Sequence, residues 1–251
     1  MLDVLKKEIE LRNLDKPYVK LIIVDKKGST PRGIGTTCFY SDGKIIGTIG
    51  GGRLEIEIIP FCERILNDEK PQLKEFVLDE DTDQMCGGRV TIYAEPHTSQ
   101  NELYIFGGGN VGLALAKVMA DTPLKIYVIE QRKELQDKNR YPNSVKLMPM
   151  PYLDAVSKIN FSDKSTFICI MTYSHNIDEQ ILHQVIVKPY WYLGIIGSKR
   201  KAVKFFARLK ENGIPEEKIS TIHCPIGIDI VKGHSPAEIA ISIAAEILSY
   251  V

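Results

Sequence analysis

The chain has 251 residues, of which 44% are hydrophobic and 25% are charged, a balance that is ordinary for a globular protein. Its 32 Lys and Arg residues equal its 32 Asp and Glu residues, whereas a general nucleic-acid-binding protein usually carries a basic excess. No apolar run approaches the roughly 20 residues that span a bilayer, and the charged N-terminus lacks a signal-peptide core. We therefore expect a cytoplasmic protein that binds neither nucleic acid nor membranes.

Residues 1–98 mix strands and helices without regular alternation, which predicts a compact N-terminal α+β domain. The expected elements are a helix over 1–14, strands over 18–25, 36–40 and 45–49, a helix over 53–67, and strands over 74–78 and 89–96. The residues expected to form the apolar face of the first helix are Leu2, Leu5, Ile9 and Leu14. Those of the second are Leu54, Ile58, Phe61 and Ile65. The polar segment 97–102 is the best linker candidate.

Residues 101–251 alternate strand and helix regularly, which predicts a C-terminal Rossmann-like domain with a mostly parallel sheet. Strands are expected over 103–106, 125–130, 144–148, 166–172 and 191–196, and helices up to about 120 and over 177–187 and 199–212. Short apolar runs among these strands indicate burial on both faces of the sheet. A last helix is expected after Ser235, which acts as N-cap before Pro236, with Glu238 completing a capping box.

The strongest local motif is a strand that runs into Gly107, Gly109 and Gly112 and then into a helix, with Val111, Leu115 and Val118 on one face. In dinucleotide-binding folds, the first glycine allows a tight turn, the second admits a pyrophosphate and the third lets helix and strand pack closely. Glu130, 18 residues after Gly112, ends the next strand, near the position of an acid that binds a ribose hydroxyl in such folds. The motif predicts a nucleotide-like ligand, although such glycines also serve packing alone.

A second candidate anion site lies in the N-terminal domain. Gly50, Gly51 and Gly52 directly precede a helix, and Arg32 and Arg53 supply positive charge beside glycine-rich loops. Backbone N–H groups at a helix start attract anions. The alternative is that these glycines only permit tight turns and that the arginines are solvated.

Two further candidates follow strands of the C-terminal domain. Ser198 is expected to cap a helix whose first turn holds Lys199 and Arg200, and positive charge there is unfavourable unless an anionic ligand is near. The alternative is a solvated basic turn. His175 follows the strand over 166–172, at the edge where open α/β sheets bind ligands. It is either an acid–base or hydrogen-bonding residue or a loop anchor.

The five cysteines, at 38, 62, 86, 169 and 224, form no CxxC pair, so reduced thiols are expected rather than disulfides or structural zinc. Cys86 differs from the others because two glycines and Arg89 follow it, which favours a reactive or metal-binding thiol. The acidic residues before Cys86 disfavour a thiolate and therefore weigh against that reactivity. No dedicated metal site is predicted, and no residue is assigned as catalytic with certainty, although Cys86 and His175 are candidates.

Several motifs together resemble the xanthine dehydrogenase accessory protein family, XdhC/CoxI. They are GSTPR (28–32), DGKIIGTIGGGRLE (42–55), CGGRVTIYAEP (86–96), IFGGGNVGLALAK (105–117), MTYSHNIDEQIL (171–182), GIIGSKRK (194–201) and PIGIDI with SPAEIAISIAAEIL (225–248). The resemblance implies a cytoplasmic helper that binds molybdenum cofactor, assists its sulfuration and delivers it to a xanthine dehydrogenase-like molybdenum hydroxylase. It also implies Cys86 as a cofactor or sulfur contact.

Two positions depart from the family pattern: Arg53 stands where CoxI-like members have Cys, and Asn110 stands where a His is common. A dinucleotide-type cleft fits the phosphate of molybdopterin as well as NAD(P). The alternatives to a chaperone are therefore an NAD(P)-dependent oxidoreductase that uses Glu130 and His175, or a nucleotide-sensing regulator. The expected partners are the hydroxylase, a cysteine desulfurase and a second copy of the chain in a homodimer.

Overall fold

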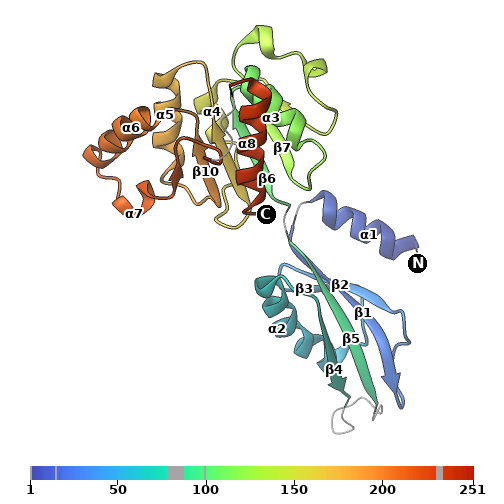
Figure 1. Cartoon of the computed structure of the whole chain (residues 1–251). Coiled ribbons are helices and arrows are strands. Elements are labelled where there is room, and N and C mark those ends of the chain that lie inside the picture. Colours follow the sequence, from blue (N-terminus) through green and yellow to red (C-terminus); the bar gives the residue numbers. More distant parts are fainter. Residues whose placement is uncertain (1, 15, 79–87, 99, 230–233) are drawn as a thin grey trace. The chain divides into compact units, whose positions relative to one another are not determined.

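The computed structural model describes residues 2–14, 16–78, 88–98, 100–229 and 234–251, and the chain divides into two compact units. They are Met1–Ser99 and Gln100–Val251, shown in blue to green and in green to red in Figure 1. No helix within the described ranges is both long and apolar enough to cross a membrane.

In its described residues the N-terminal unit is an antiparallel five-stranded sheet in the order β3-β2-β1-β5-β4, accompanied by α-helices. In chain order these elements are α1 (Leu2–Asn13), β1 (Tyr18–Lys27), β2 (Thr37–Ser41), β3 (Lys44–Ile46), α2 (Gly52–Asp68), β4 (Gln72–Val77) and β5 (Arg89–His97). His97, expected in the linker, instead belongs to β5 and stacks on Tyr18 with ring centroids 4.5 Å apart.

One face of this sheet packs on α2. Alternate residues of β1, Val19, Leu21 and Ile23, lie in one buried cluster with the apolar side of α2. The buried residues of α2 include all four predicted ones, Leu54, Ile58, Phe61 and Ile65. Every second residue of β1 and every third or fourth residue of α2 thus contribute to the same core.

The predicted apolar face of α1 is wrong. Leu5, Ile9 and Leu14 are exposed, whereas Leu11 is buried in a small cluster with Tyr18 and Phe39. The helix is turned this way because Glu8, also buried, accepts a hydrogen bond of 2.8 Å from Lys20 of β1 and one of 2.9 Å from Arg12. The Glu8–Lys20 ion pair and the contacts of Leu11, rather than the spacing of the leucines, thus determine which side of α1 is buried.

The C-terminal unit contains a six-stranded parallel sheet in the order β11-β10-β9-β6-β7-β8. The strands are β6 (Glu102–Phe106), β7 (Lys125–Ile129), β8 (Lys146–Met148), β9 (Thr166–Ile170), β10 (Tyr192–Ile195) and β11 (Ile222–His223). The α-helices are α3 (Asn110–Met119), α4 (Tyr152–Val156), α5 (His175–Val185), α6 (Lys199–Glu211), α7 (Glu216–Ile219) and α8 (Pro236–Leu248). Numbered from the start of the unit, the strand order is that of the doubly wound dinucleotide-binding fold. The predicted α/β class is confirmed, while α7 and β11 were not foreseen.

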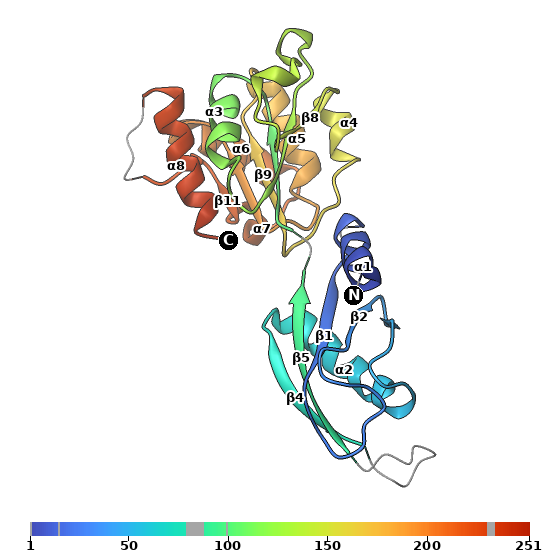
Figure 2. The same cartoon turned by 90° about the vertical axis from the view of Figure 1, so that its right-hand side faces the viewer.

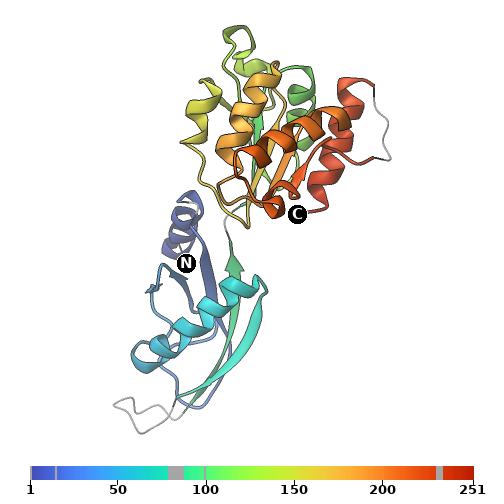
Figure 3. The same cartoon turned by 90° about the vertical axis from the view of Figure 1, so that its left-hand side faces the viewer.

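Both faces of the parallel sheet are covered. Leu103 and Ile105 of β6 lie in one buried cluster with α3 and α8, whereas Tyr104 and Phe106 lie in another with α4, α5 and α6. Figures 2 and 3 show these helical layers on opposite sides of the sheet. This arrangement accounts for the continuous apolar strands in the sequence.

The helix α3 meets the sheet through a face slightly different from the predicted one. Leu115 is buried as expected, but Val118 is 42% exposed and Met119 takes its place in the core. The buried face of α3 also includes Gly112 and Ala116, and Gly112 lies so close to the Gly107 carbonyl that no side chain fits there. At the other end of the unit, the predicted capping box of α8 is present, with Ser235 and Glu238 bonded reciprocally.

Candidate functional site

The candidate site lies where the strand order of the parallel sheet reverses. From β6 the chain passes through α3 to β7 on one side, and from β9 it passes through α5 to β10 on the other. Open α/β sheets bind ligands in the crevice between two such diverging connections. The loops meet here, because a Cβ on Gly107 would collide with the carbonyl oxygen of Met171. The backbone of Gly107 has a φ of +112°, which disfavours any larger residue.

The three fingerprint glycines have different surroundings. A Cβ on Gly112 would collide with the carbonyl oxygen of Gly107, so that this glycine serves close packing of helix and strand. A Cβ on Gly109 would meet only the Nη2 of Arg132, at 3.6 Å, and φ there is −68°. Open space therefore lies beside Gly109 at the start of α3. Asn110, the first residue of α3, is exposed next to it.

Glu130 lies fully buried beneath the glycine loop. One carboxylate oxygen accepts hydrogen bonds from the Tyr152 hydroxyl at 2.8 Å and from the backbone N and Nε of Arg132 at 2.8 and 3.0 Å. The other accepts from the Gly108 N–H and Arg132 Nη2, each at 2.8 Å. Burial alone raises the pKa of Glu130, but the hydrogen bonds from Arg132, Tyr152 and Gly108 outweigh it and lower the pKa. The geometry thus favours positioning of Arg132 over contact with a ribose.

Arg132 and Tyr152, which both donate to Glu130, are residues of this site that the sequence analysis missed. Arg132 is the one beside the open space at Gly109. Its guanidinium lies 4.8 Å from the Tyr173 ring centroid, and its side chain is only 26% exposed. It places a guanidinium, held by Glu130, beside the open space at Gly109. The available signal was its position two residues after Glu130, since an Arg near this acid accommodates a phosphate in related folds.

A neighbouring cavity of about 580 Å³ lies at the starts of α5 and α6. Its lining residues are Thr172, His175, Asp178, Ile196, Gly197, Ser198, Arg200, Lys201 and Lys204. The structure thus brings the predicted His175, Ser198 and Arg200 together. The His175 side chain is 80% exposed, with Nδ1 3.7 Å from Asp178 Oδ2.

Ser198 caps α6 as predicted, because its hydroxyl accepts a hydrogen bond from the Lys201 N–H. Lys199 points elsewhere: it lines a separate cavity of about 610 Å³ and pairs with Asp229 at 3.5 Å. That cavity also contains Glu246, which accepts from Tyr192 and from the Gly227 N–H at 2.6 Å each and lies 2.9 Å from His223 Nδ1.

The glycine run of the N-terminal unit is arranged differently from the prediction. Glu55 of α2 turns back and accepts hydrogen bonds from the Gly51 N–H at 3.0 Å, the Ile49 N–H at 3.3 Å and the Thr48 hydroxyl at 2.7 Å. The protein's own carboxylate thus occupies donors that the prediction reserved for an external anion, which weighs against a site at Gly50, Gly51 and Gly52. Of the two nearby arginines, Arg53 pairs with Glu57 at 2.7 Å and Arg32 is exposed.

Cys86 lies outside the described residues. Gly88, two residues further along, is described and lies close against the GSTPR segment (28–32), since a Cβ on Gly88 would collide with the carbonyl oxygen of Ser29. The thiols of Cys38, Cys62 and Cys169 are buried, and burial raises the pKa of the first two to about 12 and that of Cys169 well above its usual value. Burial likewise raises the pKa of the half-buried Cys224 to about 11. None of these four favours a thiolate at neutral pH.

Comparison with known families gives a match in each unit. The model described as the XdhC Rossmann domain matches residues 103–247, and that of the XdhC and CoxI family matches residues 11–77. Together they span both units of the structure.

Two curated proteins are similar to the chain. Over 243 residues, 95% of this chain and 44% of the relative, it is 32% identical to the Uncharacterized protein YqeB of Escherichia coli (strain K12). Over 146 residues, 58% of this chain and 42% of the relative, it is 25% identical to a probable xanthine dehydrogenase subunit of Bacillus subtilis (strain 168). The chain thus spans less than half the length of either relative.

Among solved structures, a crystal structure described as a xanthine dehydrogenase from Bacillus halodurans matches with a TM-score of 0.53. The identity is 20%, over 98% of this chain and 95% of that chain. At this identity the likeness supports the fold.

The glycines offer a matched pair of variants. Gly109→Val should weaken the binding of inorganic pyrophosphate, because its side chain fills the space beside Arg132, yet leave stability nearly unchanged. Gly112→Ala should lower the free energy of unfolding by about 1–3 kcal/mol, since its Cβ overlaps the Gly107 carbonyl. Calorimetry measures the first effect and urea unfolding the second. Wild-type pyrophosphate affinity in Gly109→Val would mean that the loop serves packing alone.

The lowered pKa of Glu130 predicts a pH dependence of stability. The ionised carboxylate stabilises the folded unit above the ordinary glutamate pKa of 4.5, and this contribution is lost as the pH falls through the lower folded value. Wild-type stability should therefore fall more steeply between about pH 5 and pH 3 than that of Glu130→Gln, which has no such charge to lose. Fluorescence of Trp191, the one tryptophan, follows urea unfolding of this unit. Equal pH slopes would contradict the stabilising role.

Proposed function

The chain belongs to the XdhC and CoxI family, and from this premise we propose that it is an accessory protein that binds molybdenum cofactor and assists its sulfuration and insertion into a xanthine dehydrogenase-like hydroxylase. The observation that carries the proposal is the glycine loop at the sheet's reversal point, open at Gly109 and flanked by the held cation Arg132. This arrangement fits a ligand that carries a phosphate.

The described residues fit the anionic end of such a cofactor. The start of α3 supplies backbone N–H groups and the positive end of its dipole, and Arg132, although its charge is paired with Glu130, supplies the guanidinium N–H groups that Glu130 leaves free. Glu130 keeps Arg132 in one orientation, so that little side-chain entropy is lost on binding. The cofactor itself would supply the molybdenum and its sulfur chemistry, while this chain binds and orients it.

An NAD(P)-dependent oxidoreductase is the second candidate, favoured by the dinucleotide-type strand order. Its adenosine ribose would need an acceptor, but the Glu130 carboxylate already receives five hydrogen bonds from the protein. Its acid–base residue would be His175, which is 80% exposed. These two features favour binding over hydride transfer.

Mass spectrometry of the gently purified chain separates the two candidates. We expect a retained pterin in wild-type protein and its loss in Gly109→Val, because that side chain fills the space a phosphate requires. The mass of the retained molecule then identifies the bound ligand directly. A retained nicotinamide dinucleotide would replace the chaperone proposal with the oxidoreductase.

Cys86 is proposed to contact the cofactor or carry sulfur, which requires an accessible thiolate. Cys86→Ser should fold normally but fail to restore hydroxylase activity in a strain that lacks this protein. Iodoacetamide at neutral pH should modify Cys86 ahead of the other four thiols, whose pKa values are raised by burial. Cys224→Ser, at a half-buried thiol, is the control and should complement fully. Full complementation by Cys86→Ser would contradict the proposed role of Cys86 in contacting the cofactor or carrying sulfur.

The proposed partners are the hydroxylase that receives the cofactor and a cysteine desulfurase that supplies sulfur. We also propose a homodimer, since twofold pairing is the commonest oligomeric symmetry. Sedimentation should show a dimer at micromolar concentration and a pull-down from host extract should recover a molybdenum hydroxylase. A monomer at every concentration, together with no recovered hydroxylase, would contradict the proposed partnership.

A further inference from the structure

We propose that the cavity at the starts of α5 and α6 is a second anion site, which binds a tetrahedral oxyanion and is separate from the glycine loop. The inference rests on the proposed function for the identity of the natural ligand, whereas the site itself rests on the cavity and its charges. The cavity has a volume of about 580 Å³ and lies at the carboxyl ends of β9 and β10.

The lining of this cavity has an excess of positive charge. Arg200, Lys201 and Lys204 come from α6, and Asp178 is the one acid among the described residues that line it. Asp178 is already neutralised, because its Oδ2 lies 3.1 Å from Lys201 Nζ. No ion pair among the described residues involves Arg200 or Lys204, so that two cations remain for an anion in the cavity.

The frame of the cavity is held by buried contacts. The Asp178 side chain is 1% exposed, and its Oδ1 accepts hydrogen bonds from the Thr172 hydroxyl at 2.6 Å and from the Thr172 N–H at 3.0 Å. Lys201, 12% exposed, also donates to the Ile196 carbonyl at 3.2 Å. These contacts join the loop after β9, the helix α5 and the loop before α6. The site is therefore largely formed before a ligand arrives.

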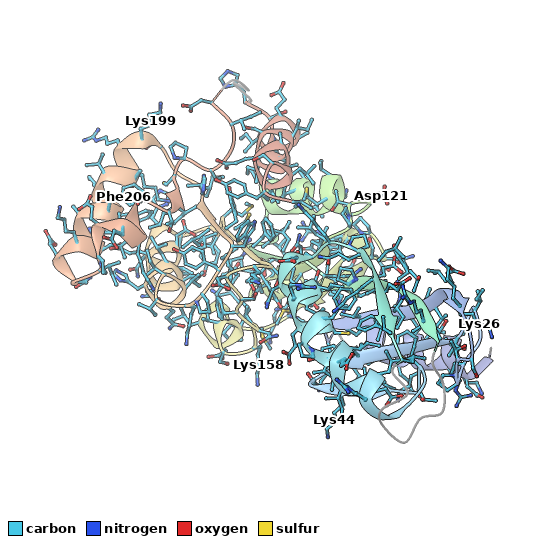
Figure 4. The ribbon with its side chains drawn as sticks, turned by 90° about the horizontal axis from the view of Figure 1, so that it is seen from below. Lys26, Lys44, Asp121, Lys158, Lys199 and Phe206 are labelled. Carbon is cyan, nitrogen blue, oxygen red and sulfur yellow. The ribbon has the colours of Figure 1, made fainter. Side chains whose placement is uncertain are left out.

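The position of the positive charges on α6 supports an anion. Three consecutive cations, Lys199, Arg200 and Lys201, open the helix, where the dipole is already positive. Figure 4 labels Lys199 at this end and Phe206 further along the same helix. Lys199 and Lys201 each have an acidic partner, whereas Arg200 has none among the described residues. An oxyanion at the cavity would offset this repulsion and accept from first-turn N–H groups.

The two anion sites suit one ligand with an oxyanion group at each end. The glycine loop follows β6 and the cavity is lined by the segments after β9 and β10, the next two strands of the sheet, so that the sites lie roughly one to two strand spacings of about 5 Å apart. A nicotinamide ring, cationic when oxidised and neutral when reduced, would gain nothing from Arg200 and Lys204. The oxyanion at the cavity has two possible sources: a phosphate group of a larger ligand, or a molybdate-type oxyanion.

An amide NMR titration tests each site separately. Inorganic phosphate and molybdate are titrated into the full chain in parallel, and the shifts of Gly197, Ser198 and Arg200 report the cavity while those of the glycine loop report the other site. We expect saturable shifts at the cavity that survive Gly109→Val. Tighter binding of molybdate supports a free metal oxyanion as the source, and equal or tighter binding of phosphate supports a phosphate group.

The charge of the cavity is tested with Arg200→Ala/Lys204→Ala, two exposed positions whose loss should not unfold the chain. The variant should raise the dissociation constant at the cavity at least about fivefold, and added salt should weaken wild-type binding. Lys164→Ala/Lys210→Ala removes two exposed charges outside the cavity and should bind as wild type. Absent cavity shifts, or an unchanged dissociation constant in Arg200→Ala/Lys204→Ala, would overturn the proposal. Either result would leave the pterin retention and complementation tests of the proposed function intact.

Discussion

The buried carboxylate of Glu130 holds together the three chain segments on which the candidate ligand site depends. It accepts hydrogen bonds from Gly108 in the glycine loop, from Arg132 after β7 and from Tyr152 at the start of α4. Removing a carboxylate from water is costly, and only such a full set of donors offsets that cost. Because the same group orients the loop and the arginine, the shape of the site and its positive charge are set by one interaction.

Other carboxylates of the chain act in the same way. Asp178 fastens the loop after β9 to α6, Glu246 accepts from Gly227 and from Tyr192, and Glu55 in the N-terminal unit accepts from Gly51. In each case an acid near a loop bonds to a backbone N–H instead of facing an external ligand. Among the described residues, Arg200 and Lys204 have no acidic partner and line the cavity at the starts of α5 and α6, while Arg132, paired with Glu130, lies beside the open space at Gly109. This division of charge makes the edge of the parallel sheet suited to anions.

Features set by neighbouring residues could be predicted from the sequence, whereas those set by distant contacts could not. The buried face of α2 and the capping box of α8 follow from local spacing and were predicted correctly. The exposure of Leu5 and Ile9 on α1 was not, since Glu8 and its partner Lys20, on a different element, decide how that helix lies. The acid at position 130 was identified from its spacing, but its partner Tyr152, 22 residues away, was not. Sequence spacing thus located the glycine loop and Glu130 but not the hydrogen bonds that hold them together.

The hydrogen bonds that Glu130 already accepts from the protein also affect which ligand would fit the candidate site. In a dinucleotide enzyme the acid at this position is expected to bind a ribose through a free oxygen. Here that oxygen is bonded to Arg132, so recognition passes from a hydroxyl acceptor to a cation. Glu130 takes the Nε–Nη2 edge of the guanidinium, and the N–H groups on its Nη1 side suit a phosphate, a stronger acceptor than a ribose hydroxyl. The change from acceptor to cation therefore favours a ligand recognised by its phosphate, as the proposed pterin would be, over an adenosine ribose recognised by its hydroxyls.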